Sequence, residues 1–245
     1  MITFTLPATP VFKLPPETIH VWRASLDIGD AEYDQHFDLL DENEKWRAKR
    51  FVFEHHKRHF VAGRSTLRQI LGRYLNIDPK DLQFTYGKHG KPTVLSEQAD
   101  PFHFNMSHSQ AIALYAVGGP LSLGVDVEVI RPSVDSLGIA KRFFTAREWQ
   151  TLERLTEPHK TQAFYNAWTR KEAFLKALGQ GLTYPLHHVD VSLLPEERAE
   201  LLAIEGSIEK AREWSLHNLE VGDDYRAALV VEGTPQAVHG WEFLA

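Results

Sequence analysis

Two carboxylates alternate with valines in residues 124–129, Gly-Val-Asp-Val-Glu-Val. In a β-strand, side chains alternate between two faces, so Asp126 and Glu128 share one face and the valines share the other. Two neighbouring acids on a strand repel each other unless a positive charge lies between them. A solvated strand face is one explanation. The flanking valines, however, indicate a buried strand, and a buried pair of acids favours a bound divalent cation.

A second segment, residues 164–176, has the periodicity of a helix with an apolar arc. Glu172 and Lys176 are four residues apart at the edge of this arc, and an ordinary surface pair at that spacing contributes about 0.2–0.5 kcal/mol. Lys171 falls in the middle of the arc. It either reaches the rim with its long stem or meets an anion that another element or a ligand brings. A third acid with two lysines around it suggests Mg²⁺ holding a phosphate ligand.

Composition limits the class of protein. The chain has 245 residues, of which 43% are hydrophobic and 24% charged, values typical of one large or two small globular domains. The net charge of -6 disfavours a nucleic-acid binder, and the absence of cysteine excludes disulfides and thiolate metal sites. Without a signal-peptide pattern or a long apolar run, we expect a cytoplasmic protein with no membrane segment. Residues 45–73 form a basic stretch, which is either a solvated helix surface or an anion site.

The elements that must position these residues can be placed along the chain. Asp41 and Glu44 form the pattern of a helix-capping box, as do Thr145 and Glu148. Long helices are predicted over 55–75 and 164–178. Strands are predicted near 19–26, 82–86, 101–105, 111–118, 121–130, 187–193, 212–219 and 225–232.

The order of these elements repeats at a constant offset of 104 residues. Val21 falls on Val125, Glu44 on Glu148, Phe60 on Phe164 and Leu71 on Leu175 without a gap. The repeat predicts an α+β fold of two similar half-domains, 1–118 and 119–245, related by a pseudo-twofold axis. The Gly-Gly-Pro turn at 118–120 joins them. A ligand is then expected in the cleft between the halves.

Two segments of the first half carry groups suited to phosphate. The turn at 87–92 has two glycines that permit close backbone approach and two lysines, although a plain surface turn has the same composition. Residues 104–109, Phe-Asn-Met-Ser-His-Ser, end a strand in short hydroxyl and imidazole groups that suit phosphate oxygens or satisfy their own turn. A serine hydrolase is disfavoured, because there is no G-x-S-x-G motif and adjacent Ser107 and His108 point apart.

Together, these motifs resemble the 4′-phosphopantetheinyl transferases of the surfactin-synthetase-activating (Sfp) type, over roughly residues 40–185. The motifs that carry the resemblance are Arg-Phe at 50–51, Gly-Arg at 63–64, Leu-Arg at 67–68, Gly-Lys-Pro at 90–92, and the segments 104–108, 124–128 and 168–176. The resemblance implies a pseudo-dimer of α+β halves with coenzyme A between them.

The resemblance also implies roles for individual residues. Asp126, Glu128 and Glu172 would bind Mg²⁺ against the pyrophosphate of coenzyme A. Arg47 would meet the 3′-phosphate of the nucleotide, while Arg64 either binds ligand or braces its helix. The full set of implied contacts to coenzyme A is Arg47, Lys88, Lys91, Asn105, Ser107, His108, Lys171 and Lys176.

The expected reaction moves the 4′-phosphopantetheine arm of coenzyme A to a serine of an apo acyl or peptidyl carrier protein and releases adenosine 3′,5′-bisphosphate. Glu172, or a metal-bound water beside it, would deprotonate the serine. Lys176 would stabilise the departing phosphate. The expected catalytic residues are therefore Glu172, Lys176 and Asp126. The carrier would dock on the basic stretch 45–73 or on an apolar groove between the halves, and the enzyme would act as a monomer.

Three other functions fit parts of the pattern. A coenzyme A-binding module would keep the cleft without the chemistry, although the complete set of acids and lysines weighs against it. A metal-dependent phosphohydrolase or nuclease would use the same acids, but the negative net charge disfavours nucleic acid. A structural pseudo-dimer with incidental acids predicts no thermal stabilisation by coenzyme A with Mg²⁺.

Overall fold

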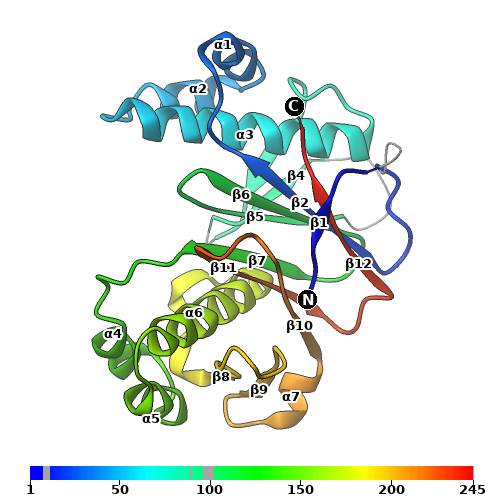
Figure 1. Cartoon of the computed structure of the whole chain (residues 1–245). Coiled ribbons are helices and arrows are strands. Elements are labelled where there is room, and N and C mark those ends of the chain that lie inside the picture. The colour runs from blue at the N-terminus through cyan, green and yellow to red at the C-terminus, as the bar shows by residue number, and fades with distance from the viewer. Residues whose placement is uncertain (8–11, 89, 96–101, 245) are drawn as a thin grey trace.

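The computed structural model describes residues 1–7, 12–88, 90–95 and 102–244. Its main elements form four layers, with helix α3 (Glu54–Leu75) outside one sheet and helix α6 (His159–Leu178) outside the other (Figure 1). The two sheets lie between the helices. None of the helices in the described part of the chain combines the length and apolarity that crossing a bilayer requires.

The N-terminal half builds the larger sheet and its helices. Its elements are β2 (Thr18–Ser25), α1 (Asp30–Asp38), α2 (Glu42–Ala48), α3, the hairpin β3 (Phe84–Tyr86) and β4 (Pro92–Val94), β5 (His103–Ser109) and β6 (Ile112–Gly118). Together with β1 (Phe4–Thr5) and β12 (Ala237–Glu242) from the ends of the chain, the order in the sheet is β1-β12-β2-β6-β5. The strand predicted near 101–105 is therefore β5, and residue 101 lies outside the described residues.

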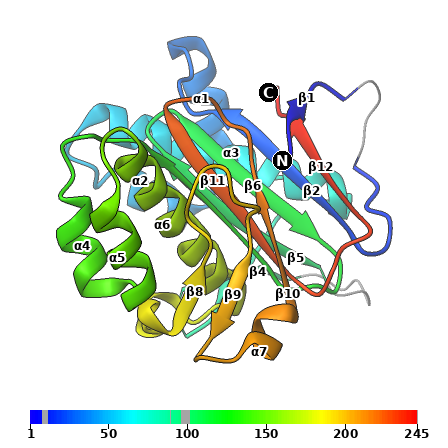
Figure 2. The ribbon, with the colours of Figure 1, turned by 60° about the horizontal axis from the view of Figure 1, so that its bottom comes forward.

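The C-terminal half repeats this plan. Its elements are β7 (Leu123–Val129), α4 (Ser136–Phe143), α5 (Ala146–Arg154), α6, β8 (Val189–Val191), β9 (Leu201–Ile204), α7 (Ile208–Arg212), β10 (Trp214–Asn218) and β11 (Tyr225–Glu232). The order in the second sheet is β10-β11-β7, which matches β5-β6-β2 in the first. Figure 2 shows α4 and α5 beside α6.

The predicted repeat is confirmed by the positions of the elements. Shifted by 104 residues, α3 falls on 158–179, and α6 occupies His159–Leu178. Strand β2, shifted in the same way, falls on 122–129, and β7 occupies Leu123–Val129. Both capping boxes form as predicted, at Asp41 and at Thr145. The protein therefore has the α+β fold of two similar halves that the sequence predicted.

Two short segments at the ends of the chain join the first sheet. Strand β12 (Ala237–Glu242) pairs in parallel with β2, and β1 (Phe4–Thr5) pairs with β12. The last strand therefore returns to the sheet of the N-terminal half. The division into 1–118 and 119–245 stays a proposal, in which β12 is the part of the second segment that packs with the first.

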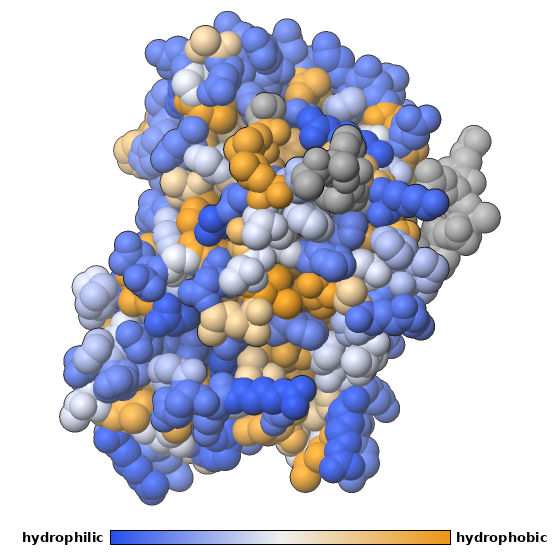
Figure 3. All heavy atoms as spheres, turned by 45° about the vertical axis from the view of Figure 1, so that its right-hand side comes forward, coloured by the Kyte–Doolittle hydropathy of each residue, from blue (hydrophilic) through white to orange (hydrophobic). Residues whose placement is uncertain are grey.

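Three apolar clusters hold the four layers together. One, with Trp22 and Leu71, lies between α3 and the first sheet; another, with Phe174 and Val230, lies between α6 and the second sheet. The third, with Val21, Val125 and Leu229, lies between the sheets and joins the halves. Burial of apolar area contributes about 25 cal/mol per Å², so this third cluster fixes how the halves meet. On the face in Figure 3, hydrophilic side chains dominate both ends of the molecule and apolar patches lie nearer the middle.

Candidate active site

A cleft of about 560 Å³ opens between the halves, and both halves line it. The first half contributes side chains from α2, α3, the β3–β4 hairpin and β5, and the second contributes side chains from β7 and α6. The lining residues are Arg47, His59, Phe60, Gly63, Arg64, Tyr86, Gly90, Pro92, Met106, Ser107, His108, Asp126, Glu128, Trp168, Glu172 and Lys176. The predicted position of the site, at the seam of the two halves, matches this cleft.

The close approach of α6 to β7 depends on Gly124. A Cβ atom at this position would lie 2.2 Å from the carbonyl oxygen of Ala173 and 2.4 Å from the amide nitrogen of Ala177. Because strand side chains alternate, Gly124 shares its face with Asp126 and Glu128. Glu172 and Lys176 are one helical turn apart on α6. The contact at Gly124 therefore brings the acids of β7 and the charged groups of α6 into one cleft.

Asp126 lies at the centre of this arrangement, with only 3% of the residue exposed. Its Oδ1 accepts hydrogen bonds from Lys176 Nζ at 2.7 Å and from Ser107 Oγ at 2.9 Å. Its Oδ2 is buried and has no hydrogen-bond partner among the described residues. A buried, unpaired carboxylate oxygen is costly, so this atom marks a place where a cation would be stabilised.

Burial and neighbouring negative charge raise the pKa values of two of these acids, Glu172 and Glu128. Burial and, less strongly, the charge of Asp126 raise the pKa of Glu172 to about 7, against the opposing charge of Lys176. Burial and Asp126 also raise the pKa of Glu128, which a hydrogen bond from Ser109 partly offsets. One lysine thus neutralises only part of the charge of three carboxyl groups. A dication would remove the rest of the repulsion.

The acids do not form a closed metal cage. In the described ranges, no three His, Cys, Asp or Glu side chains are arranged closely enough to hold an ion among them. Magnesium, however, commonly binds one or two carboxylates and takes its other ligands from water and substrate phosphates. An open cluster of acids with an unpaired Asp126 oxygen is consistent with this mode of magnesium binding. The three-acid magnesium site remains a prediction.

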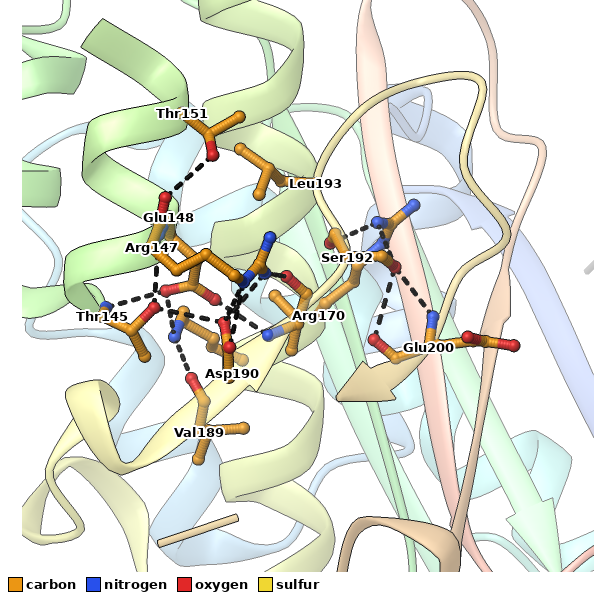
Figure 4. A network of polar contacts seen from close by, with 12 residues as sticks. Thr145, Arg147, Glu148, Thr151, Arg170, Val189, Asp190, Ser192, Leu193 and Glu200 are labelled. Atoms are coloured by element: carbon orange, nitrogen blue, oxygen red, sulfur yellow. Dashed lines mark hydrogen bonds and ion pairs between the residues drawn. The ribbon is translucent and has the colours of Figure 1, made fainter. Parts of the chain in front are cut away.

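Lys171 does not lie in the cleft, and its predicted contact with a phosphate is wrong. The side chain is fully buried away from the cleft, where its Nζ lies 2.7 Å from Oε2 of Glu148 on α5. It also donates to the carbonyl oxygens of Leu186 and Val189. Figure 4 shows Glu148 and Val189 within this polar network. The alternative, that another element brings an anion to Lys171, is confirmed.

Two further residues that were predicted to contact the ligand, Lys91 and Asn105, instead contact other parts of the protein. Lys91 Nζ donates to the carbonyl oxygens of Lys176 at 2.8 Å, Ala177 at 3.1 Å and Leu123 at 3.3 Å, so it joins the turn to the end of α6. Burial lowers the pKa of Lys91. Asn105 Oδ1 accepts the amide of Val125 at 2.9 Å. These side chains connect the halves instead of meeting a ligand, because each finds partners on the opposite half.

The turn itself still reaches the cleft. Gly90 and Pro92 line the cleft. Lys88 is exposed and is not among the residues that line it. Residue 89 lies outside the described residues.

The remaining predicted contacts do line the cleft. Arg47 is exposed at its edge, with its guanidinium 5.2 Å from the centre of the Phe60 ring. Ser107 and His108 lie on the wall that β5 forms. Burial lowers the pKa of His108, and the charge of Lys176 lowers it further. A neutral imidazole beside Lys176 would be able to accept as well as donate a hydrogen bond.

Arg64 braces the first half. Its Nε donates to Glu44 Oε1 at 2.6 Å and its Nη2 donates to the hydroxyl of Tyr86 at 3.4 Å. Its guanidinium also lies over the ring of Phe84. Arg64 therefore connects the buried cap of α2 to the β3–β4 hairpin, and its edge lines the cleft.

Several lining residues were not predicted from the sequence. They are His59, Phe60, Gly63, Tyr86, Met106 and Trp168. Trp168 had a usable signal, because it precedes Glu172 and Lys176 at successive intervals of four residues. Tyr86 had none, since only the position of the hairpin in the folded structure places it at the cleft.

Comparison with known proteins shows matches along both halves. The family described as the 4′-phosphopantetheinyl transferase superfamily matches residues 122–230, and the family described as 4′-phosphopantetheinyl transferase, N-terminal, matches residues 22–118. The 4′-phosphopantetheinyl transferase HetI of Nostoc sp. is 38% identical over 238 residues, covering 97% of this chain and 95% of the relative.

Other matches are more distant. The 4′-phosphopantetheinyl transferase Sfp of Bacillus subtilis is 29% identical over 166 residues, covering 68% of this chain and 72% of the relative. Among solved structures, the holo-[acyl-carrier-protein] synthase of Thermotoga maritima is 23% identical, with a TM-score of 0.36, and covers 46% of this chain and 63% of that chain.

Proposed function

The chain belongs to the 4′-phosphopantetheinyl transferase superfamily, and we propose that its cleft transfers the phosphopantetheine arm of coenzyme A to a serine of an apo carrier protein. One observation supports this most directly. Asp126, Glu128, Glu172 and Lys176 line a single cleft between the halves, and a buried oxygen of Asp126 is left unpaired. Such a cleft suits a cation on the acids and a diphosphate bound against that cation.

The cationic side chains would hold the two ends of coenzyme A. Arg47 is exposed at the edge of the cleft, where it would bind the 3′-phosphate of the nucleotide. Lys176 already lies 2.7 Å from Asp126, so its ammonium is oriented toward the centre of the cleft, where the pyrophosphate would lie. His108 and Ser107 flank it on the β5 wall. Charge-assisted hydrogen bonds to phosphate are the strong ones in such sites.

We propose that Asp126, Glu128 and Glu172 hold Mg²⁺, in line with the orphaned oxygen of Asp126 and with the raised pKa of Glu172. Bound there, the ion would neutralise charge on the pyrophosphate and orient it. Lys176 would supply the remaining positive charge. The protein would need no nucleophile of its own, because the carrier supplies the serine that attacks.

Glu172 is our candidate for the general base, through a carboxylate oxygen that the ion leaves free or through a metal-bound water beside it. A carboxyl group with a pKa of about 7 is partly ionised at neutral pH and accepts a proton readily. The serine oxygen would form a bond to the phosphorus next to the pantetheine arm as its proton passes to Glu172. The phosphoanhydride bond would break, and adenosine 3′,5′-bisphosphate would leave with its new charge held by Lys176.

Modification of a carrier tests the proposal. The protein is incubated with coenzyme A, Mg²⁺ and each of several apo carriers, and the mass of each carrier is measured, with Asp126→Ala as the control variant. An increase equal to a phosphopantetheine group on one carrier, lost in the control, supports the proposal. Binding of coenzyme A without modification of any carrier would indicate a binding module, and phosphate release from simple esters would indicate a phosphohydrolase.

The remaining expectations concern the setting of the enzyme. We propose that it acts as a monomer in the cytoplasm, since one chain already contains both halves of the cleft. Size-exclusion chromatography with light scattering tests the oligomeric state. A dimer at assay concentration would contradict it.

A further inference from the structure

Strands β5 and β7 belong to different sheets, yet β7 is held along its edge by side chains of β5. Alternate polar residues of β5 accept the backbone amides of alternate residues of β7. The three contacts are Asn105 Oδ1 with Val125 N at 2.9 Å, Ser107 Oγ with Val127 N at 3.4 Å, and Ser109 Oγ with Val129 N at 3.0 Å.

The edge of β7 that meets β5 is hydrogen-bonded differently from the matching edge of β2 in the first half. The counterpart of β7 is β2, whose edge pairs with the backbone of β12. On β7, one edge pairs with β11 and the other meets the side chains of β5. Buried amides need partners, and either solution satisfies them. Hydroxyl groups, however, keep a hydrogen that they can donate elsewhere, which a backbone carbonyl cannot do.

Ser109 uses that hydrogen on an acid of the site. While its Oγ accepts the amide of Val129, it donates to Oε2 of Glu128 at 3.0 Å. The residue is 7% exposed, and it is not part of the described lining of the cleft. Its hydroxyl therefore fixes one carboxylate oxygen of Glu128 relative to the backbone of β7 from behind the site.

Ser107 makes the equivalent pair of contacts with Val127 and Asp126. Ser107, however, also receives a hydrogen bond from Lys176 and lines the cleft. Its removal would therefore disturb several groups together. Ser109 contacts only Glu128 and the amide of Val129 in this way, so its removal changes the support of Glu128 without touching Lys176 or the lining of the cleft.

We propose that Ser109 is a positioning residue that orients Glu128 for metal binding. The proposal rests on the proposed function, in which Glu128 is a ligand of Mg²⁺. Glutamate has one more rotatable bond than aspartate, so an unsupported Glu128 would sample several orientations in the cleft. Residues that orient metal ligands through hydrogen bonds commonly change metal affinity by about 10–100-fold when they are removed.

Metal binding by the intact protein tests this role. Mn²⁺ affinity is measured by calorimetry for the wild type and for Ser109→Ala, Ser109→Thr and Ser215→Ala. Ser215 lies on β10 and its hydroxyl contacts the carbonyl oxygen of Val231, so its substitution controls for loss of a strand hydroxyl. We expect Ser109→Ala to bind Mn²⁺ about 10–100-fold more weakly. Ser109→Thr, which keeps a hydroxyl, should recover most of the affinity, and Ser215→Ala should match the wild type.

A double variant separates positioning from loss of folding. In the Glu128→Gln background, Ser109→Ala should weaken Mn²⁺ binding no further, because the ligand that it orients is already gone. Equal effects in both backgrounds would overturn the proposal, as would wild-type affinity in Ser109→Ala. If the wild type itself bound no Mn²⁺, the proposed metal site would fail first, and the role of Ser109 with it.

Discussion

Glu148 Oε2 lies 2.7 Å from Lys171 Nζ, and both side chains are completely buried. Glu148, the third residue of α5, also accepts the amide of the N-cap residue Thr145 at 2.8 Å in the capping box. Its counterpart in the first half, Glu44, accepts from Arg64 and Arg68 of α3 at 2.6 Å each. In both halves, therefore, a capping glutamate anchors a short helix to a cation of the long helix that packs on the sheet.

Lys171→Met should destabilise the fold. The substitution keeps an unbranched side chain that is one atom shorter but leaves Glu148 as an unpaired buried charge, and breaking a buried ion pair in this way costs about 3–5 kcal/mol. Urea denaturation measures the change. The double variant Glu148→Gln/Lys171→Met should recover part of the loss, because it removes both charges. A higher KM for coenzyme A with unchanged stability would instead return Lys171 to the ligand site.

Gly124→Ala should separate α6 from β7. The new methyl group would lie 2.2 Å from the carbonyl oxygen of Ala173, which belongs to helix backbone and cannot rotate away. Shifts of about 1 Å near a reaction centre commonly cost about 100-fold in rate, so we expect a loss of that order in kcat. Gly119→Ala is the matched control, because no atom lies within 4 Å of its Cβ position. Equal activity of the two variants would contradict the packing argument.

Activity should depend on the ionisation of Glu172. Its pKa is about 7, so the carboxylate that accepts the serine proton is formed as the pH rises through that value. At fixed low Mg²⁺, kcat/KM should increase by about tenfold per pH unit below the pKa and level off above it. Higher Mg²⁺ should shift this rise to lower pH, because a nearby dication favours the carboxylate. A Glu172→Gln variant that retains turnover would place the base elsewhere.

The same ionisation should appear in the stability of the ligand-free protein. Glu172 has a pKa of about 7 when folded, raised from 4.5, so the folded state binds more protons between these values. Its contribution to the free energy of unfolding is present below about pH 4.5 and is lost as the pH rises through 7. Urea denaturation across this range should show a decline that Glu172→Gln reduces. An identical pH dependence in the variant would exclude this residue as the source.

Arg47→Ala should remove recognition of the 3′-phosphate. A hydrogen bond to a charged group contributes about 1.5–3 kcal/mol, which corresponds to about 10–100-fold in kcat/KM. The variant should lose that factor with coenzyme A but not with 3′-dephospho-coenzyme A. Arg50 stacks on Trp46 in the same exposed stretch, so Arg50→Ala controls for a general loss of positive charge. Equal losses with both substrates would place the phosphate elsewhere.

Local spacing was enough to predict much of the site. The period of two along β7 put Asp126 and Glu128 on one face, and the period of a helix put Glu172 and Lys176 one turn apart. The offset of 104 residues predicted the matching elements of the halves, because a capping box or an apolar period can be recognised within a short segment of sequence. These features depend on the backbone of a single element, so a sequence is sufficient to determine them.

Only the tertiary structure decided where the long side chains find their partners. Lys171 turns to Glu148, Lys91 to the carbonyl oxygens that end α6, and Asn105 to an amide of β7. The partners along the matching edges of β2 and β7, which are β12 and the serines of β5, likewise belong to elements that only folding brings alongside. Each choice depends on which element lies within a few ångströms after folding. Residue type alone, a lysine or an asparagine in a motif, does not distinguish a ligand contact from a contact that joins the halves.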